Sequence, residues 1–242
     1  MYYPGLYFDI GRKARDLLYN GYVQRPPKDL HFQRFDCNLD LSCQFRDIVP
    51  GLRTLFKLSI PDSAKVELQY LQKYVGISGG LGLIADPLTG ISPLINFSGV
   101  LGSDFLSLGT DVAFDISTGT LNKLNAGLSI SSDFLIASLT LHDKLDSWRA
   151  SCYYVMNPLT NTAIGAELKH TLSDSDSAIT VGGQHALFPS TLMKARINTY
   201  GRAGALIQQE FWEKVALTLA GEVDFTDINE TPKIGLSIAF RL

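Results

Sequence analysis

The stretch that decides the fold is Lys233-Ile234-Gly235-Leu236-Ser237-Ile238-Ala239-Phe240-Arg241-Leu242. Large apolar residues stand at every second position of this stretch, and polar or small residues stand between them. Because successive side chains of a strand point to opposite sides of the sheet, this period predicts a sheet with one apolar and one polar face.

The same two-residue period recurs through most of the chain from about residue 32 onward. It is clear in residues 35–41, 66–70, 106–115, 124–130 and 217–224. Short runs rich in Ser, Asp, Asn, Gly and Pro separate the alternating stretches and predict turns. We therefore expect about 15 strands of roughly 9 to 12 residues, joined by short turns.

The expected strand length favours a membrane barrel over a soluble sandwich. Strands of globular proteins usually have about five or six residues, whereas a tilted strand needs about 9 to 11 to cross a bilayer. The sequence shows no long Greek-key crossover. An open sheet edge in lipid would leave backbone amides without hydrogen-bond partners. The sequence therefore predicts an all-β fold, a transmembrane antiparallel β-barrel over residues 32–242.

The composition excludes some classes of protein and leaves others open. A mean hydropathy of +0.09 and 19% charged residues suit both a soluble β protein and a membrane barrel. No run of 18 apolar residues is present, which argues against a transmembrane helix. A net charge of -3 gives no reason to expect nucleic acid as a partner. The first residues lack the pattern of a secretory signal, so we expect a protein that stays inside the cell.

Residues 1–24 follow a helical rather than a strand period. The apolar residues that recur at helical intervals are Leu6, Ile10, Ala14, Leu17 and Leu18. This spacing predicts an amphipathic helix of about four turns, with a left-handed stop at Asn20-Gly21. Pro26 and Pro27 cannot continue a helix, so residues 25–31 are expected to form a Pro-rich linker.

Several blocks of the sequence resemble a known family. The first is Gly5-Leu6-Tyr7 followed by Ile10-Gly11-Arg12-Lys13-Ala14-Arg15-Asp16-Leu17-Leu18-Tyr19. Others are residues 96–100, 106–113, 178–182 and 221–224, and the most specific combines His185, Pro189, Thr191, residues 195–198 and residues 205–206. On these residues the chain resembles the plant mitochondrial outer-membrane porins, the voltage-dependent anion channels, over nearly its whole length.

The resemblance implies a function and a set of partners. It implies a voltage-gated, weakly anion-selective diffusion pore for small metabolites, nucleotides and ions across the mitochondrial outer membrane. Membrane lipid would surround the barrel, anionic metabolites and nucleotides would be the permeants, and the protein could form a homo-oligomer. Neither a cofactor nor a metal is implied. Members of this family have about 19 strands, which is more than the alternation of this sequence predicts, so the chain resembles a shortened member.

The period and the resemblance together assign roles to particular residues. The charges expected to line the pore include Lys65, Lys123, Lys169, Lys194, Arg196, Glu222 and Asp224. The helix is expected to lie in or near the lumen and to gate it through Arg12, Lys13, Arg15 and Asp16. Its expected anchors to the wall are Leu6, Ile10, Leu17 and Leu18, and its expected hinge consists of Gly21, Pro26 and Pro27. The positive and negative charges expected on the lumen side of the strands cancel, and the helix adds a surplus of one positive charge. This surplus predicts weak anion selectivity.

Other interpretations remain open at this point. The barrel could be a non-conducting membrane scaffold or docking surface, the chain could be a soluble all-β binding protein, or it could be a protein-import channel. The helix could be a static plug instead of a gate. Aromatic residues near expected strand ends, Tyr153 among them, fit an interfacial girdle and ordinary strand positions equally well. Metalloprotease, hydrolase and P-loop motifs are absent from the sequence, so we do not expect an enzyme.

Overall fold

The computed structural model describes residues 4–22, 39–46, 52–60, 63–86, 90–211, 215–226 and 232–240. The strands within these residues are β1 (Leu39–Arg46), β2 (Leu52–Ile60), β3 (Ser63–Leu71), β4 (Val75–Asp86), β5 (Gly90–Gly102), β6 (Leu106–Asp115), β7 (Thr120–Ser131), β8 (Leu135–His142), β9 (Ser147–Asn157), β10 (Thr162–Thr171), β11 (Asp176–Phe188), β12 (Thr191–Asn198), β13 (Arg202–Phe211), β14 (Val215–Asp224) and β15 (Lys233–Phe240). They belong to one sheet in which the spatial order is the sequence order. The prediction of an all-β fold with about 15 strands is confirmed. The start of the expected strand at residues 35–38 lies outside the described residues.

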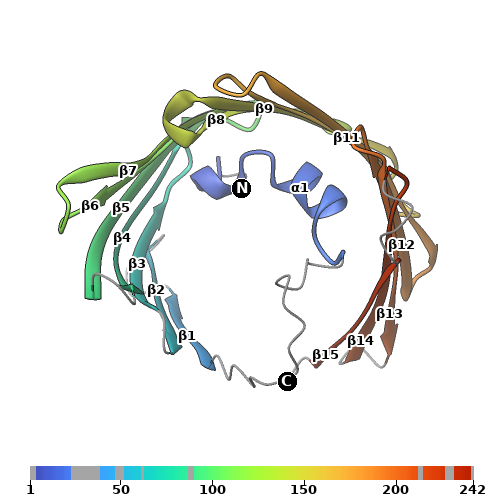
Figure 1. Cartoon of the computed structure of the whole chain (residues 1–242), viewed down its shortest axis with the longest axis horizontal. Coiled ribbons are helices and arrows are strands. Elements are labelled where there is room, and N and C mark those ends of the chain that lie inside the picture. The colour runs from blue at the N-terminus through green and yellow to red at the C-terminus, as the bar shows by residue number, and fades with distance from the viewer. Residues whose placement is uncertain are drawn as a thin grey trace. The chain divides into compact units, whose positions relative to one another are not determined.

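The strands follow one another as an antiparallel meander. β1 to β7 and β10 to β15 pair with their sequence neighbours, as the succession of β11 to β15 shows in Figure 1. Directly opposed residues such as Leu217 and Ile238 share one face, so the period of one strand is carried to the next. Short turns fix this register, and no long crossover separates the paired strands.

The chain divides into two compact units. The first comprises Met1–Ile10, His31–Ser131 and Ser138–Trp148, and the second comprises Gly11–Leu30, Ser132–Ala137 and Arg149–Leu242. In the first unit, a 3₁₀ turn, η1 (Tyr7–Asp9), contacts β5 and β6. In the second unit, helix α1 (Arg12–Leu18) contacts β10, β11 and β12, and Figure 1 shows it beside β11. A second 3₁₀ turn, η2 (Asp143–Leu145), precedes β9.

In the strands whose side chains the structure describes, the apolar rows are exposed and do not pack into a dry interior. On β15, Ile234 is 77% exposed and Leu236 is 65% exposed. On β12, Met193 and Ile197 are exposed while Lys194 and Arg196, at alternate positions, are partly buried. A soluble binding protein would cover such rows, because large exposed apolar surfaces are unfavourable in water. The arrangement suits strands whose apolar face meets hydrocarbon.

The N-terminal segment differs from the predicted single helix of about four turns. It consists of the η1 turn and the seven-residue helix α1, with a break between them at Gly11. Gly11 has φ of +68°, a left-handed conformation that glycine adopts without steric cost and that interrupts the helix. Gly21, at the expected stop, has φ of +91°. Pro26, Pro27 and the rest of the expected linker lie outside the described residues.

Candidate site on the polar face of the sheet

The N-terminal segment is packed on the polar face of each unit by its apolar side chains. Leu6, Ile10, Leu17 and Leu18 are all buried, and Leu18 has an exposed fraction of 0%. In the second unit, Leu17 and Leu18 form a cluster with Tyr153 of β9. Full burial of one leucine side chain stabilises a structure by about 1.5 to 3 kcal/mol. Apolar packing therefore holds the segment on a surface that is otherwise polar.

Tyr153 of β9 lies beneath the N-terminal helix. The side chain is buried in the cluster beneath α1, and the ammonium of Lys13 lies 6.0 Å from the centre of its ring. Of the two interpretations that the sequence left open for Tyr153, the ordinary strand position is therefore the one that the structure shows, and the interfacial girdle is not. Tyr153 alternates along β9 with the residues of the apolar face and shares the polar face with Arg149 and Ser151. The two-residue period of the strand therefore predicts its correct side.

Glycines of the strands make room for the segment. In the first unit, a Cβ added at Gly109 or Gly127 would lie 3.2 Å from Cδ1 of Ile10. In the second unit, a Cβ at Gly182 would lie 2.9 Å from Cδ2 of Leu18, and one at Gly204 would lie 3.1 Å from the ring of Tyr22. These glycines were not singled out in the sequence. The signal that could have found them is their phase, since they occupy polar-face positions.

Two basic side chains of β12 bind the C-terminal end of α1. Lys194 Nζ donates a hydrogen bond of 2.8 Å to the carbonyl oxygen of Asp16. Arg196 Nη1 donates one of 2.8 Å to the carbonyl oxygen of Leu18. The last carbonyls of a helix lack intrahelical donors and carry the negative end of its dipole, so cations are favourable there. Lys194 and Arg196 thus act together as a cationic clasp, the name used for this pair below.

Arg196 also joins aromatic and acidic groups around the clasp. Its guanidinium lies 4.4 Å from the ring centre of Tyr22 and 5.4 Å from that of Tyr19, within the range of cation–π attraction. Its Nη2 pairs with Glu222 at 3.0 Å. Burial raises the pKa of the Tyr22 hydroxyl to about 12, against an opposing effect of the nearby guanidinium.

Glu167 of β10 is the most deeply buried carboxylate of this region. The Tyr19 hydroxyl donates a hydrogen bond of 2.8 Å to it, and Arg149 Nε lies 3.4 Å from the same carboxylate. Burial, as the largest cause, raises the pKa of the Tyr19 hydroxyl. Tyr19 therefore ties the end of α1 to a charge pair of the sheet, a contact that the sequence did not predict.

Further charge pairs follow the polar face of each unit. In the first unit the pairs are Lys65–Glu67 at 2.7 Å and Lys123–Asp111 at 2.5 Å, and in the second unit Arg202 pairs with Asp224 at 2.8 Å. Lys169 is exposed at a polar-face position of β10, and Lys233 stands opposite Glu222. Arg202 was not among the residues singled out in the sequence. Its alternation with Ala203 and Ala205 could have identified it as a residue of the polar face.

Of the basic residues of α1, Arg12 and Lys13 are exposed and Arg15 is half-buried. Arg12 pairs with Asp16 at 3.5 Å, one turn further along the exposed surface of the helix. The Arg12 and Asp16 side chains are 57% and 50% exposed, so their pairing contributes little stability. The helix therefore presents basic groups to solvent above the polar face of the second unit.

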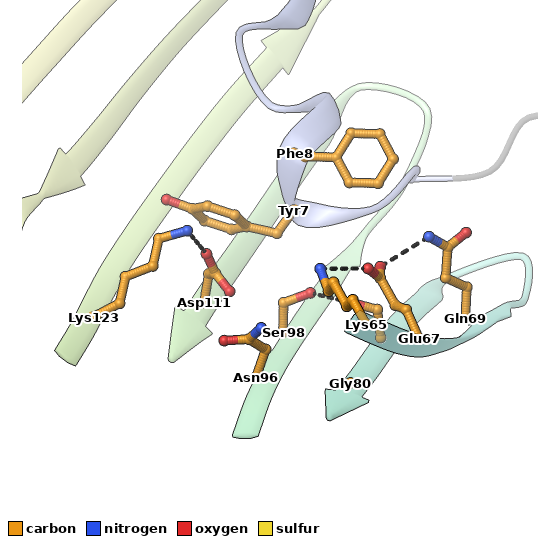
Figure 2. Close-up of a pocket in the computed structure, with 11 residues that line it drawn as sticks. Tyr7, Phe8, Lys65, Glu67, Gln69, Gly80, Asn96, Ser98, Asp111 and Lys123 are labelled. Atoms are coloured by element: carbon orange, nitrogen blue, oxygen red, sulfur yellow. Dashed lines mark hydrogen bonds and ion pairs between the residues drawn. The ribbon is translucent and has the colours of Figure 1, made fainter. Parts of the chain in front are cut away.

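In the first unit, a pocket of about 340 Å³ lies beneath η1. Tyr7 and Phe8 border one side, and polar side chains of β3 to β7 form the other, as Figure 2 shows. Lys65 and Lys123 are both among the lining residues. Two of the residues expected to line a pore thus belong to one defined cavity.

The described part of the chain contains no group of three or more His, Cys, Asp or Glu side chains that could hold a metal ion. None of the helices in that part is long and apolar enough to cross a membrane.

Comparison with known proteins identifies close sequence relatives. A model of the eukaryotic porin family matches residues 32–235. The mitochondrial outer membrane protein porin of 36 kDa from Solanum tuberosum and porin 1 from Arabidopsis thaliana are each 43% identical over 277 residues, covering 98% of both chains. The outer plastidial membrane protein porin of Pisum sativum is 38% identical with the same coverage. Because 277 aligned positions exceed the 242 residues of this chain, the relatives contain positions that have no counterpart here.

Solved structures show the same fold at low sequence identity. A chain from a structure described as "Asymmetric conductivity of engineered proteins" has a TM-score of 0.54 and 14% identity, over 84% of this chain and 88% of that chain. A triple mutant of the Rh. blastica porin has a TM-score of 0.51 and 13% identity, over 84% of this chain and 96% of that chain. These likenesses support the antiparallel β-barrel predicted from the sequence.

Proposed function

This chain belongs to the eukaryotic porin family, and on that premise we propose that it is a voltage-gated, weakly anion-selective pore of the mitochondrial outer membrane. The family is one of channels, so the chain is a pore for small solutes. The names of the Solanum tuberosum and Arabidopsis thaliana relatives support the location. Anionic metabolites, nucleotides and inorganic ions are the proposed permeants.

The observation that carries the proposal is the opposite character of the two sheet faces. The apolar rows are exposed on one face, whereas ion pairs and the N-terminal segment lie on the other. A face with this many charges needs water, and a face of exposed aliphatic side chains needs hydrocarbon. We assign the polar face to the lumen and residues 32–242 to the barrel, with residues 1–24 as a segment on its inner wall and 25–31 as their linker.

Weak anion selectivity is supported by the way the charges are distributed. Strand charges are largely paired, so they contribute local fields of both signs. The N-terminal segment adds Arg12, Lys13 and Arg15 against Asp9 and Asp16, a surplus of one positive charge. A small surplus of one sign raises the local concentration of counter-ions modestly, and salt screens the effect.

Voltage gating is supported by the charge and the attachment of the segment. A charged element responds to the membrane field, at about 2.3 kcal/mol per elementary charge and 100 mV. The cationic clasp and the buried leucines favour the docked position. We assign Gly21, Pro26 and Pro27 as the hinge, and release of the segment from the wall as the gating movement.

Planar-bilayer recording tests both properties. Neutralising Arg12, Lys13 and Arg15 together to Gln should lower the anion preference in reversal potentials and flatten the dependence of conductance on voltage. A matched control removes positive charge outside the strands, at Lys73 and Lys144 in turns, and should change neither property. Clear cation preference of the wild-type protein would contradict the selectivity, and an unchanged triple variant would contradict the role of the segment.

A second candidate function is a non-conducting membrane scaffold. The observation that favours it is the shorter chain, since relatives have aligned positions that this chain lacks. Barrel width grows with strand number, so fewer strands enclose a narrower lumen. Absence of single-channel current from protein with a native β spectrum would favour the scaffold.

A further inference from the structure

Two histidines of the second unit lie on the apolar face of the sheet, near opposite ends of the strand pair β10 and β11. Nδ1 of His185 lies 2.8 Å from Oγ1 of Thr162, and Nδ1 of His170 lies 2.8 Å from Oγ of Ser177 on the opposed strand. We propose that His185 binds the phosphate group of a membrane phospholipid. The proposal rests on the proposed function, because the apolar face meets lipid only in a membrane barrel.

The phase of the strands places His185 among the residues that face hydrocarbon. On β11 it is in phase with Ile179 and Val181, which are both exposed. On β12 its opposed residue is Met193, which is exposed as well. His185 is itself exposed, whereas Gly182, on which α1 packs, belongs to the opposite face of the same strand. An imidazole in this row therefore contacts the lipid that covers the apolar side chains.

The spacing of the two histidines along the strands gives the depth of His185 in the membrane. His185 stands eight positions after Ser177 on β11, which is about 26 Å along the strand at about 3.3 Å per residue. At a tilt of about 35 to 45°, this distance spans about 19 to 22 Å of the membrane, slightly less than the apolar band of about 25 Å. The pair of His185 with Thr162 and the pair of His170 with Ser177 therefore lie near the two rims of this band. At a rim, an imidazole keeps its ring carbons in hydrocarbon and places its polar tip in the headgroup layer.

His185 differs from the other polar side chains at its rim in having a ring nitrogen to offer. Thr191 and Gln209 are opposed on β12 and β13, and the Thr191 hydroxyl donates a hydrogen bond to the Gln209 amide oxygen. The amide nitrogen of Gln209 donates in turn to Oγ of Ser190 at 3.0 Å, so this group is satisfied internally. Within the part of the chain that the structure describes, Thr162 is the only hydrogen-bond partner of the His185 side chain. Its Nε2 is therefore available to a ligand.

A short chain of hydroxyl groups determines which ligand suits this nitrogen. Oγ1 of Thr160 lies 2.6 Å from Oγ1 of Thr162, which lies 2.8 Å from Nδ1 of His185. When Thr160 donates to Thr162 and Thr162 donates to Nδ1, each hydroxyl uses its one proton, and Nε2 carries the proton of the ring. A phosphate group offers only acceptor oxygens, and an ionised oxygen accepts more strongly than an ester carbonyl. The site therefore favours the phosphate of a phospholipid over its ester groups and over a headgroup ammonium.

Solid-state NMR of the full chain, refolded in bilayers of dioleoyl phosphatidylcholine, tests the contact directly. The histidines carry ¹⁵N, and the buffer contains no phosphate, so that the lipid supplies all the phosphorus. The sample is kept at about pH 8, above the range in which imidazole titrates in water. We expect Nε2 of His185 to be protonated and to lose signal through dipolar coupling to ³¹P, as a hydrogen bond of about 2.9 Å to a phosphate oxygen requires. Nδ1 of the same ring should be unprotonated.

Four variants assign the effect to the site. His185→Phe identifies the signals of His185 by their disappearance, and Thr162→Val removes the neighbouring hydroxyl but keeps the ring. In Thr162→Val the ratio of phosphate-bound to unbound ring should fall about 2- to 12-fold, the effect of one hydrogen bond, and Thr162→Ser should restore it. Thr110→Val is the matched control, since it makes the same change at an exposed position of the apolar face on β6, and it should behave as wild type.

Several outcomes would overturn the inference. An Nε2 signal of His185 without coupling to ³¹P in the wild-type protein would do so, as would a ring protonated on Nδ1 and bare on Nε2. Equal coupling in wild type and Thr162→Val would refute the role of the hydroxyl chain in holding the ring. Absence of channel current from the same bilayers would instead refute the proposed pore. The coupling to ³¹P then still decides the lipid site, because a non-conducting barrel also meets lipid with its apolar face.

Discussion

Replacement of Gly182 by alanine should loosen the N-terminal segment from the wall. A Cβ at this position would lie 2.9 Å from Cδ2 of Leu18 and 3.2 Å from Cδ2 of Leu17. It would also lie 2.7 Å from the carbonyl oxygen of Ala195, which is backbone of the neighbouring strand β12. The leucine side chains can move away, whereas the strand backbone cannot move without disturbing its hydrogen bonds. The added methyl group therefore displaces α1.

The magnitude follows from the packing beneath α1. An extra methyl group in a well-packed site costs about 1 to 3 kcal/mol. Burial of Leu17 and Leu18 contributes on the order of 3 to 6 kcal/mol to docking, since each leucine contributes about 1.5 to 3 kcal/mol. The substitution thus removes a large share of the apolar contribution, and the ratio of docked to released segment should fall about 5- to 150-fold.

Limited proteolysis measures this ratio, because the segment contains trypsin sites at Arg12, Lys13 and Arg15. When opening is fast relative to cleavage, the cleavage rate is proportional to the population of the released state. We therefore expect cleavage of the segment in Gly182→Ala to be about 5- to 150-fold faster than in wild type, with the strands still resistant.

The neighbouring glycine provides the control. A Cβ at Gly183 would meet only the carbonyl oxygen of Ala163, at 3.6 Å, which is an ordinary contact. Gly183→Ala changes the same strand by the same group on the opposite face, so it should be cleaved as slowly as wild type. Equal cleavage rates for the two variants, fast or slow, would refute the conclusion that Gly182 belongs to the surface on which α1 packs.

Three further predictions concern the charges and hydroxyls of the second unit. Lys194→Gln should weaken docking by about 0.5 to 1.5 kcal/mol through loss of the bond to the Asp16 carbonyl, while Lys194→Arg should restore it; equal tryptic cleavage of the two variants would contradict the clasp. Because the pKa of Tyr22 is raised to about 12, docking favours the neutral phenol, so this contribution is complete below about pH 10 and is lost as the pH rises toward 12. Tyr22→Phe should remove the highest-pH step of tyrosinate absorbance, and persistence of that step would disprove the assignment. Arg202→Gln leaves Asp224 unpaired on the polar face and should shift reversal potentials toward cations, whereas Arg202→Lys should not; identical potentials would exclude these residues from the lumen.

Alternation in the sequence predicted the strands because the side of a strand on which a residue lies is a local property. The exposed Ile234 and Leu236 of β15 occupy the positions that the two-residue period assigned to the apolar face. The same rule assigned Lys194, Arg196 and Glu222 to the polar face, where the structure places them together. Where the two faces of a sheet meet different solvents, every strand must carry the alternation of apolar and polar residues.

Features that depend on contacts between distant parts of the chain could not be predicted in the same way. Lys194 and Asp16 are 178 residues apart, and nothing in either neighbourhood specifies their meeting. The break at Gly11 was hidden because Leu6, Ile10 and Ala14 retain helical spacing across it. One straight helix and two short segments that both pack apolar side chains against the sheet produce the same spacing of apolar residues.

The hydrogen bonds of the cationic clasp go to carbonyl oxygens of the main chain, and Arg196 also contacts the rings of Tyr19 and Tyr22. Every amino acid supplies the same oxygen, so substitutions at Asp16 or Leu18 leave the two acceptors themselves in place. A grafted peptide should therefore be held if its helix ends at the same height, if it offers apolar residues where Leu17 and Leu18 pack, and if it keeps aromatic rings at the positions of Tyr19 and Tyr22. Sensor or reporter segments that keep these few side chains can be designed for exchange at this wall.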